Sequence, residues 1–126
     1  MKNCKILIID DDVHIRQLLE INLRAASYDV VSCTNGKEAL DKIKIEKPDL
    51  VILDIMMPEI DGLEVCKIIK DDPEIENIKV IMLTARGSAK DKMICKDILK
   101  ADEYMSKPFE MDNLLSVIKD LLNARC

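Results

Sequence analysis

Three short apolar runs constrain the fold of this chain more than any other feature. They span residues 6–9, 50–53 and 80–83 and contain only Ile, Leu, Val and Met. Continuous apolar runs of this length, separated by helical patterns, are typical of strands that are buried on both faces of a parallel sheet. The sequence therefore predicts an α/β fold in which helices cover both faces of the sheet.

Two further strands are predicted near residues 29–33 and 103–106, so five strands alternate with five helical patterns. The helix after the fourth strand has a weak apolar stripe, because lysines interrupt Met93, Ile94 and Ile98, and we expect it to present a surface to a partner. Crossovers between parallel strands are right-handed. We therefore expect an open, doubly wound sheet of five parallel strands in the flavodoxin-like order 2-1-3-4-5, with five helices.

Length and charge restrict the class of protein. A chain of 126 residues holds one core, which predicts a single domain over residues 1–126. Its net charge of -5 makes direct binding to nucleic acid unexpected. No apolar stretch approaches the roughly 18 residues of a membrane span, and residues 1–9 lack the features of a signal peptide. We therefore expect a cytoplasmic protein with no membrane contact.

The cysteines are odd in number and show no paired spacing, which predicts neither a disulfide framework nor a zinc site. We expect them to be reduced thiols that mostly pack as small apolar side chains, with the terminal one exposed. They are Cys4, Cys33, Cys66, Cys95 and Cys126.

Polar residues close each apolar run. Asp10 and Asp11 follow the first run, Asp54 follows the second, and Thr84 follows the third. Ligands of such sheets bind at the carboxyl ends of the strands, so these residues should meet at one edge. Three carboxylates repel one another unless a cation lies between them. So few side-chain oxygens, with room for water, suit Mg²⁺ better than Ca²⁺.

Lys107 follows the fifth predicted strand and can bring a positive charge to the same edge. A metal ion, a lysine and a hydroxyl around a carboxylate are typical of a phosphoryl-transfer site. Asp54 is the candidate nucleophile, because it stands alone at the end of its strand whereas Asp10 and Asp11 share a turn.

The motifs together resemble those of the response regulator receiver domain, and they cover nearly the whole chain in the right order. The resemblance implies a cytoplasmic phosphoacceptor of two-component signalling that is phosphorylated on an aspartate. It is carried by residues 6–12, 54–58, 61–62, 83–85 and 107–109.

The resemblance also implies residue roles. Asp54 would accept the phosphoryl group, and Mg²⁺ would be held by Asp11, Asp54 and the backbone carbonyl of Met56, with Asp10 acting mostly through water. Thr84 would contact the phosphoryl oxygens and Lys107 would pair with their charge. Tyr104 would change rotamer with the phosphorylation state, and the Lys107–Pro108 bond would be cis. Met56 and Arg86 would tune the loss of phosphate, which we expect to be slow.

The resemblance implies a histidine kinase or phosphotransfer protein as phosphodonor, and a downstream protein target or fused output domain as receiver of the signal. The surface that changes would be the fourth helix, fifth strand and fifth helix. The protein would be a switch with slow autodephosphorylation and not a turnover enzyme. Asn113 and Val117 stand where DNA-binding relatives often carry charged dimer contacts, so we expect a monomer or weak dimer. The sequence given favours a stand-alone regulator or a phosphorelay intermediate, although excision from a longer protein stays open.

Simpler interpretations exist for single residues. An aspartate after a strand is commonly a helix cap, which we expect for Asp12, and His14 is expected to be exposed surface. Two other functions share parts of the pattern. A magnesium-dependent aspartyl phosphatase needs a second aspartate where Met56 stands, and a flavin-binding protein needs phosphate-binding amides where the chain has Asp10–Asp12.

Overall fold

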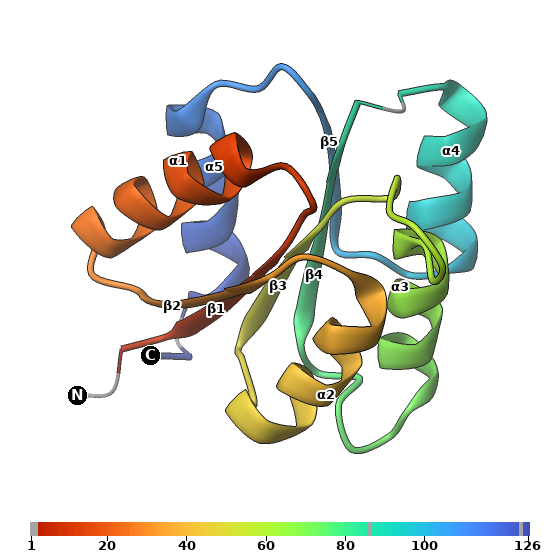
Figure 1. The fold of residues 1–126 in the computed structure, drawn as a ribbon, viewed down its shortest axis with the longest axis horizontal. Coiled ribbons are helices and arrows are strands. Elements are labelled where there is room, and N and C mark those ends of the chain that lie inside the picture. The colour runs from red at the N-terminus through yellow and green to blue at the C-terminus, as the bar shows by residue number, and fades with distance from the viewer. Residues whose placement is uncertain (1–2, 86, 124) are drawn as a thin grey trace.

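The computed structural model describes residues 3–85, 87–123 and 125–126. One sheet contains five parallel strands, β1 to β5, in the order β2-β1-β3-β4-β5 (Figure 1). The predicted strand order is thus confirmed. The strands are β1 (Lys5–Ile9), β2 (Asp29–Cys33), β3 (Leu50–Leu53), β4 (Lys79–Thr84) and β5 (Glu103–Ser106).

In the described residues, four helices connect the strands, a fifth follows β5, and together they cover both faces of the sheet. Helices α1 and α5 pack on one face, and α2, α3 and α4 pack on the other (Figure 1). Helix α4 continues directly as a π-helical turn, η1 (Ile94–Ile98). The helices are α1 (Val13–Ala25), α2 (Gly36–Glu46), α3 (Gly62–Asp71), α4 (Ala89–Met93) and α5 (Met111–Leu121).

Two apolar layers explain why the strand sequences are continuously apolar. In β1, Ile6 and Ile8 pack in the layer beneath α1 and α5, whereas Leu7 and Ile9 pack in the layer beneath α2 and α3. Successive side chains of a strand point to opposite faces, so a strand that is covered on both faces requires an apolar residue at every position.

Side-chain caps fix the start of four helices. In each, the carboxylate, amide or hydroxyl oxygen accepts a hydrogen bond from a backbone N–H in the first turn, which satisfies a donor that has no partner within the helix. The cap expected at Asp12 is confirmed, and the exposed position expected for His14 is confirmed too. The capping residues are Asp12, Asn35, Asp61 and Ser88.

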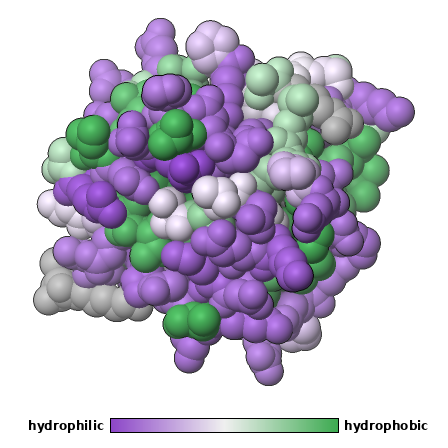
Figure 2. Space-filling model, viewed as in Figure 1, coloured by the Kyte–Doolittle hydropathy of each residue, from purple (hydrophilic) through white to green (hydrophobic). Residues whose placement is uncertain are grey.

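The region of α4 and η1 has the weak apolar face that its sequence predicts. Met93 is 50% exposed and Ile98 is 62% exposed. Apolar side chains are visible near α4 on a face that is otherwise mostly hydrophilic (Figure 2). After η1, Lys100 adopts a left-handed conformation with φ of 63°. This segment therefore offers apolar surface to solvent.

The prediction that all cysteines are reduced thiols is wrong for one pair. Cys4 and Cys126 form a disulfide with a Cα–Cα distance of 5.4 Å. Cys33, Cys66 and Cys95 are buried thiols outside this disulfide, as expected. The pairing could not be read from spacing, because it depends on α5 returning the end of the chain to the start of β1.

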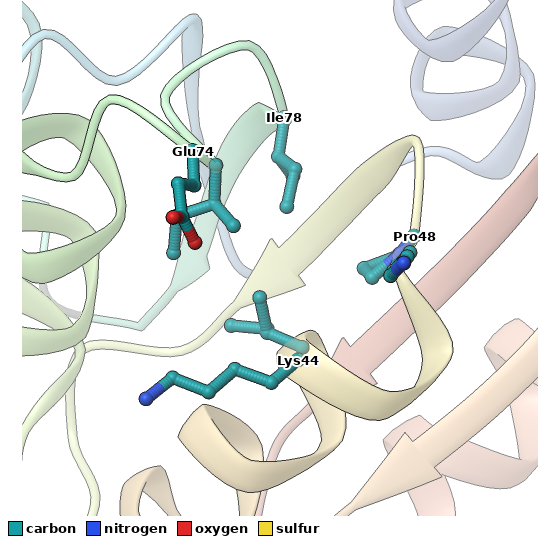
Figure 3. A pocket seen from close by; sticks show the side chains of 7 residues that line it. Lys44, Pro48, Glu74 and Ile78 are labelled. Atoms are coloured by element: carbon teal, nitrogen blue, oxygen red, sulfur yellow. The ribbon is translucent and has the colours of Figure 1, made fainter.

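A pocket lies at the edge of the sheet where the strands begin (Figure 3). It has a volume of about 500 Å³ and lies between the end of α2 and the chain that precedes β4. Lys44 and Glu74 approach it from opposite sides in Figure 3. The lining residues are Ile43, Lys44, Lys47, Pro48, Glu74, Ile75 and Ile78.

Across residues 3–85, 87–123 and 125–126, the structure has no helix with the length and apolar character needed to cross a bilayer.

Candidate functional site

The polar residues that close the apolar strands meet at one edge of the sheet, as the sequence predicts. Asp10 directly follows β1, Asp54 directly follows β3, and Thr84 is the last residue of β4. Strand β3 lies between β1 and β4. Carboxylate oxygens of Asp10, Asp11 and Asp54 lie within 4.8 Å of one another.

Backbone hydrogen bonds continue past the strand ends and hold the two buried aspartates. The N–H of Asp54 donates to the carbonyl of Ile9 at 3.0 Å. The backbone N–H of Asp12 donates to Asp10 Oδ1 at 2.9 Å, and that of Met56 donates to Asp54 Oδ1 at 3.1 Å. Each carboxylate thus has one oxygen fixed by an N–H two residues further along the chain.

Lys107 joins the two carboxylates. Its Nζ lies 2.7 Å from Asp10 Oδ2 and 3.4 Å from Asp54 Oδ2. Its backbone N–H donates to the carbonyl of Thr84 at 2.8 Å, and the Lys107–Pro108 bond is cis, as the resemblance implies. The lysine therefore brings the end of β5 to the ends of β1 and β3.

Burial determines the electrostatics of the site. Asp10 is 3% exposed and Asp54 is 7% exposed. Burial raises the pKa of Asp10, while hydrogen bonds from Lys107 and the Asp12 N–H act in the opposite direction. Burial also acts to lower the pKa of Lys107, but its hydrogen bond to Asp10 and the charges of Asp10 and Asp54 outweigh that effect and raise the pKa. The lysine therefore stays charged and offsets part of the negative charge.

The donor set fits a hard divalent cation. All three side chains supply carboxylate oxygens, which Mg²⁺ prefers, and Asp11 is exposed, so the cluster is open to solvent on one side. Met56 lies in the same loop, with its side chain 57% exposed. Its backbone carbonyl as a metal ligand stays a prediction.

Thr84 and Tyr104 lie on the same face of two neighbouring strands. Thr84 is paired in register with Ser106, and Met82 is paired with Tyr104. Because side chains alternate along a strand, Thr84 and Tyr104 point to the same face, toward α4. Both are buried, at 0% and 7% exposed. Arg86, which the resemblance gives a role in phosphate loss, lies outside the described residues.

The sequence did not reveal two features of the site, which are the hydrogen bond of Arg16 to Asp10 and the reason for a glycine at position 62. Arg16 donates from its guanidinium to the Asp10 carbonyl at 2.8 Å, a role signalled only by a cation one turn into α1. The positive φ of this loop belongs to Glu59, at 66°, and not to Gly62. Gly62 is needed for space, since a Cβ there would lie 2.1 Å from the Asp54 carbonyl oxygen.

Comparisons with known proteins agree on one family. The sequence model of the response regulator receiver domain matches residues 6–119. The alkaline phosphatase synthesis transcriptional regulatory protein PhoP of Bacillus subtilis is 42% identical over 120 residues, which are 95% of this chain and 49% of the relative. A probable transcriptional regulator, ycf27, of Cyanophora paradoxa is 42% identical over 118 residues, which are 94% and 48% of the two chains. The chain spans about half the length of these relatives.

Solved structures give the same result. A putative response regulator from Chloroflexus aurantiacus has a TM-score of 0.89 and 37% identity, with 96% of this chain and 98% of that chain covered. The chemotaxis protein CheY4 of Vibrio cholerae has a TM-score of 0.88 and 30% identity, with 96% and 100% covered. The BeF3-activated receiver domain of Klebsiella pneumoniae RstA has a TM-score of 0.86 and 30% identity, with 94% and 98% covered.

Proposed function

This chain belongs to the response regulator receiver domain family, the phosphoacceptor switches of two-component signalling, and we propose that Asp54 is its phosphoacceptor. The observation that carries the proposal is the surroundings of the Asp54 carboxylate. It lies at the end of the central strand, among two further carboxylates, with Lys107 Nζ 3.4 Å from its Oδ2. We take residues 1–126 as one receiver domain.

Asp54 is a better nucleophile than its two neighbours. Asp10 is more buried than Asp54, and its Oδ2 lies 2.7 Å from Lys107 Nζ, so that oxygen is already engaged in an ion pair. Asp11 is exposed and lies on the turn after β1. Asp54 Oδ2 has a longer contact with the lysine, which leaves it accessible to attack an incoming phosphorus atom.

The transfer forms one bond and breaks one. An Asp54 oxygen bonds to the phosphorus of a phosphohistidine, the phosphorus–nitrogen bond breaks, and the imidazole leaves with the electron pair. Lys107 pairs with the phosphoryl charge and the Thr84 hydroxyl donates to a phosphoryl oxygen, so the side chains of this edge position and neutralise the group.

Asp10, Asp11 and Asp54, with the backbone carbonyl of Met56, would hold Mg²⁺ at this edge, and Asp10 would act mostly through water. When bound, Mg²⁺ supplies positive charge that offsets the charge of the three carboxylates and of the phosphoryl oxygens. This fits the carboxylate oxygens that the structure brings within 4.8 Å.

Phosphorylation would act as a switch through Thr84 and Tyr104. The phosphoryl group adds about two negative charges beside Lys107 and attracts the Thr84 hydroxyl. A movement of Thr84 opens space on the face toward α4, which Tyr104 on the neighbouring strand fills. The surface of α4, β5 and α5 would then change, and partners would read it.

The domain is a phosphoacceptor and not a metabolic enzyme. We propose that it loses its phosphate slowly, because Met56 and Arg86, at the two positions that tune this hydrolysis, lack the acid or amide that orients a water. The exposed Met56 side chain is consistent with this role.

We propose a histidine kinase or phosphotransfer protein as donor and a downstream protein or fused output domain as target. The relatives in the comparisons include proteins named as transcriptional regulators, of which this chain spans about half. The domain itself would work in the cytoplasm without contacting nucleic acid or membrane, as a monomer or weak dimer, since Asn113 and Val117 offer no charged contacts to a second copy.

The test is the intact mass of the protein after incubation with acetyl phosphate, with and without Mg²⁺. We expect a Mg²⁺-dependent gain of one phosphoryl group in the wild type and in a control, Asp112→Ala, which removes an exposed carboxylate of α5. Asp54→Ala should gain nothing. No gain in the wild type, or a gain that persists in Asp54→Ala, would overturn the proposal.

A further inference from the structure

The two ends of the chain meet at the edge of the sheet opposite the phosphoacceptor site. Cys4 precedes β1 and Cys126 follows α5, and the start of β1 lies close to the C-terminal end of the chain in Figure 1. Asp49 precedes β3, the neighbour of β1. The two sulfurs and a carboxylate oxygen of Asp49 all lie within 4.8 Å of one another.

Contacts other than the disulfide hold these three residues in place. The backbone N–H of Lys5 donates to Asp49 Oδ2 at 2.8 Å, which orients the carboxylate. The guanidinium of Arg125 donates to the carbonyls of Asp49 at 3.2 Å and Asn77 at 2.6 Å, which anchors the residue before Cys126. Because these bonds do not involve sulfur, the three side chains stay together when the disulfide is opened.

We propose that, in the reduced protein, Cys4, Asp49 and Cys126 bind a thiophilic divalent cation such as Zn²⁺, and that the disulfide is the oxidised, metal-free form of this site. Two thiolates and one carboxylate are a donor set that Zn²⁺ accepts, and the fourth position is left to water. Ligand atoms around a tetrahedral zinc lie about 3.3–3.8 Å apart, so the cluster needs only a small adjustment.

The charges around the cluster favour a divalent ion. Two thiolates and a carboxylate carry three negative charges, the ion carries two positive charges, and the neighbouring Arg125 offsets the remainder. The N–H of Lys5 on Asp49 is the kind of outer contact that fixes a metal ligand. Cys4 is 2% exposed whereas Cys126 is exposed, so the ion would be sheltered on one side and open to water on the other.

The two states are linked by reduction and metal binding. A phosphine reductant gives two electrons to the disulfide and becomes a phosphine oxide. The oxygen of this oxide comes from water, and the two protons of that water appear on the two thiols. Binding of Zn²⁺ then releases both thiol protons to the solvent as two metal–sulfur bonds form.

The other thiols and the carboxylates of the phosphoacceptor edge are distinct from this cluster. Burial raises the pKa of Cys33 and of Cys66 to about 12, which keeps these thiols protonated. The phosphoacceptor edge offers only oxygen donors. A bound ion with thiolate ligands therefore reports on the cluster of Cys4, Asp49 and Cys126, and the inference does not depend on the role proposed for Asp54.

The test is titration of the full chain with Co²⁺, whose absorption distinguishes thiolate from oxygen ligands. We expect reduced wild type to give the near-ultraviolet thiolate-to-cobalt band and the visible bands of a tetrahedral ion, which one equivalent of Zn²⁺ removes. Cys126→Ser should lose the thiolate band, and Asp49→Asn should bind at least tenfold more weakly. Asp29→Asn, whose backbone N–H bonds to the Cys4 carbonyl, is the matched control and should bind like wild type.

Three results would overturn the inference. They are a reduced wild type without the thiolate band, a band that survives in Cys126→Ser, and a band in protein whose disulfide is intact. Circular dichroism of each variant establishes that it is folded. Cys126 is exposed, so its substitution avoids the core and keeps the test valid if Cys4→Ser fails to fold.

Discussion

Asp10 and Asp54 hold the same position relative to their strands, yet their surroundings differ. Each follows its strand directly and accepts a backbone N–H from two residues further on. Lys107 Nζ lies 2.7 Å from Asp10 Oδ2 but 3.4 Å from Asp54 Oδ2. The lysine thus neutralises mainly Asp10, which agrees with the proposal that Asp54 is the reactive carboxylate.

This arrangement predicts the titration of Asp10. Burial raises its pKa, and Lys107 is the largest opposing influence. Lys107→Ala should therefore raise the pKa of Asp10 further, as measured from its side-chain carbonyl ¹³C shift by NMR. Asp12 is the internal reference, because its pKa is lowered mainly by the His14 N–H and least by Lys107, so it should change less than that of Asp10 and stay below the ordinary value. An unchanged midpoint for Asp10 would contradict the assigned contact.

The same shift links stability to pH. Because the folded pKa of Asp10 is above its unfolded value, protonated Asp10 favours the folded state. That contribution is present below about pH 4 and is lost as the pH rises through the raised pKa. Urea unfolding across this range should show a larger loss in Lys107→Ala than in wild type.

Met56 provides a second prediction at this scale. Its backbone N–H donates to Asp54 Oδ1, and the residue is 57% exposed. Met56→Asn keeps the backbone bond and adds an amide that can orient water. We expect phosphate loss to accelerate on the order of ten- to a hundredfold, measured by the decay of phosphorylated protein. Met56→Leu should decay like wild type, and equal lifetimes for Met56→Asn and wild type would refute the tuning role.

At the scale of elements, the end of η1 shows a backbone conformation that its residue does not favour. The N–H of Ala101 donates to the carbonyl of Cys95 at 2.8 Å, which closes the helix around Lys100. Lys100 has a φ of 63°, a region that glycine enters without steric cost. The lysine is therefore a destabilising choice at this position.

Lys100→Gly should stabilise the protein by about 0.5–1 kcal/mol, because the left-handed penalty of a side chain exceeds the entropy cost of glycine. The free energy of unfolding from urea titration measures this. Lys92→Gly is the matched control, since Lys92 is also exposed but lies within α4, where glycine should cost about 1 kcal/mol. A loss of stability in Lys100→Gly would contradict the prediction.

The elements that the sequence predicts well are those whose signal is local. The predicted strand 50–53 is β3 with the same bounds, and Asp12 caps α1 as expected, because burial on two faces and capping both depend on neighbouring residues. The π-helical turn η1 could not be predicted, because it depends on how the segment packs on β5. Gly62 belongs to a motif that carries the family resemblance, but the reason for a glycine there could not be predicted, since the close approach to Asp54 arises only after α3 has packed.

At the scale of the whole molecule, opposite edges of one sheet carry different chemistry. Carboxylates and Lys107 meet where the strands end, whereas Cys4 and Cys126 join the chain termini where the strands begin. Sequence predicted the first cluster, because every strand end carries its own polar signal. It could not predict the second, because the position of Cys126 depends on the direction and length of α5.

The disulfide joins residues separated by 122 positions. Such a link restricts nearly the whole unfolded chain, so its reduction in the presence of a chelator should lower stability by about 2–4 kcal/mol. Urea unfolding, with and without reductant, measures the difference. Cys126→Ser should be insensitive to reductant, and identical unfolding midpoints for oxidised and reduced wild type would contradict the prediction.

The pairing of Lys107 with Asp10 also has a consequence for biosynthesis. Strands β1, β2 and β3 are neighbours, so the three can assemble once the ribosome has released the chain through Leu53. The lysine follows Asp10 by 97 residues, so Asp10 and Asp54 lack this partner until translation has passed residue 107. A nascent chain can therefore have three strands of its sheet and still be unable to signal, because the lysine of the phosphoacceptor edge is made later.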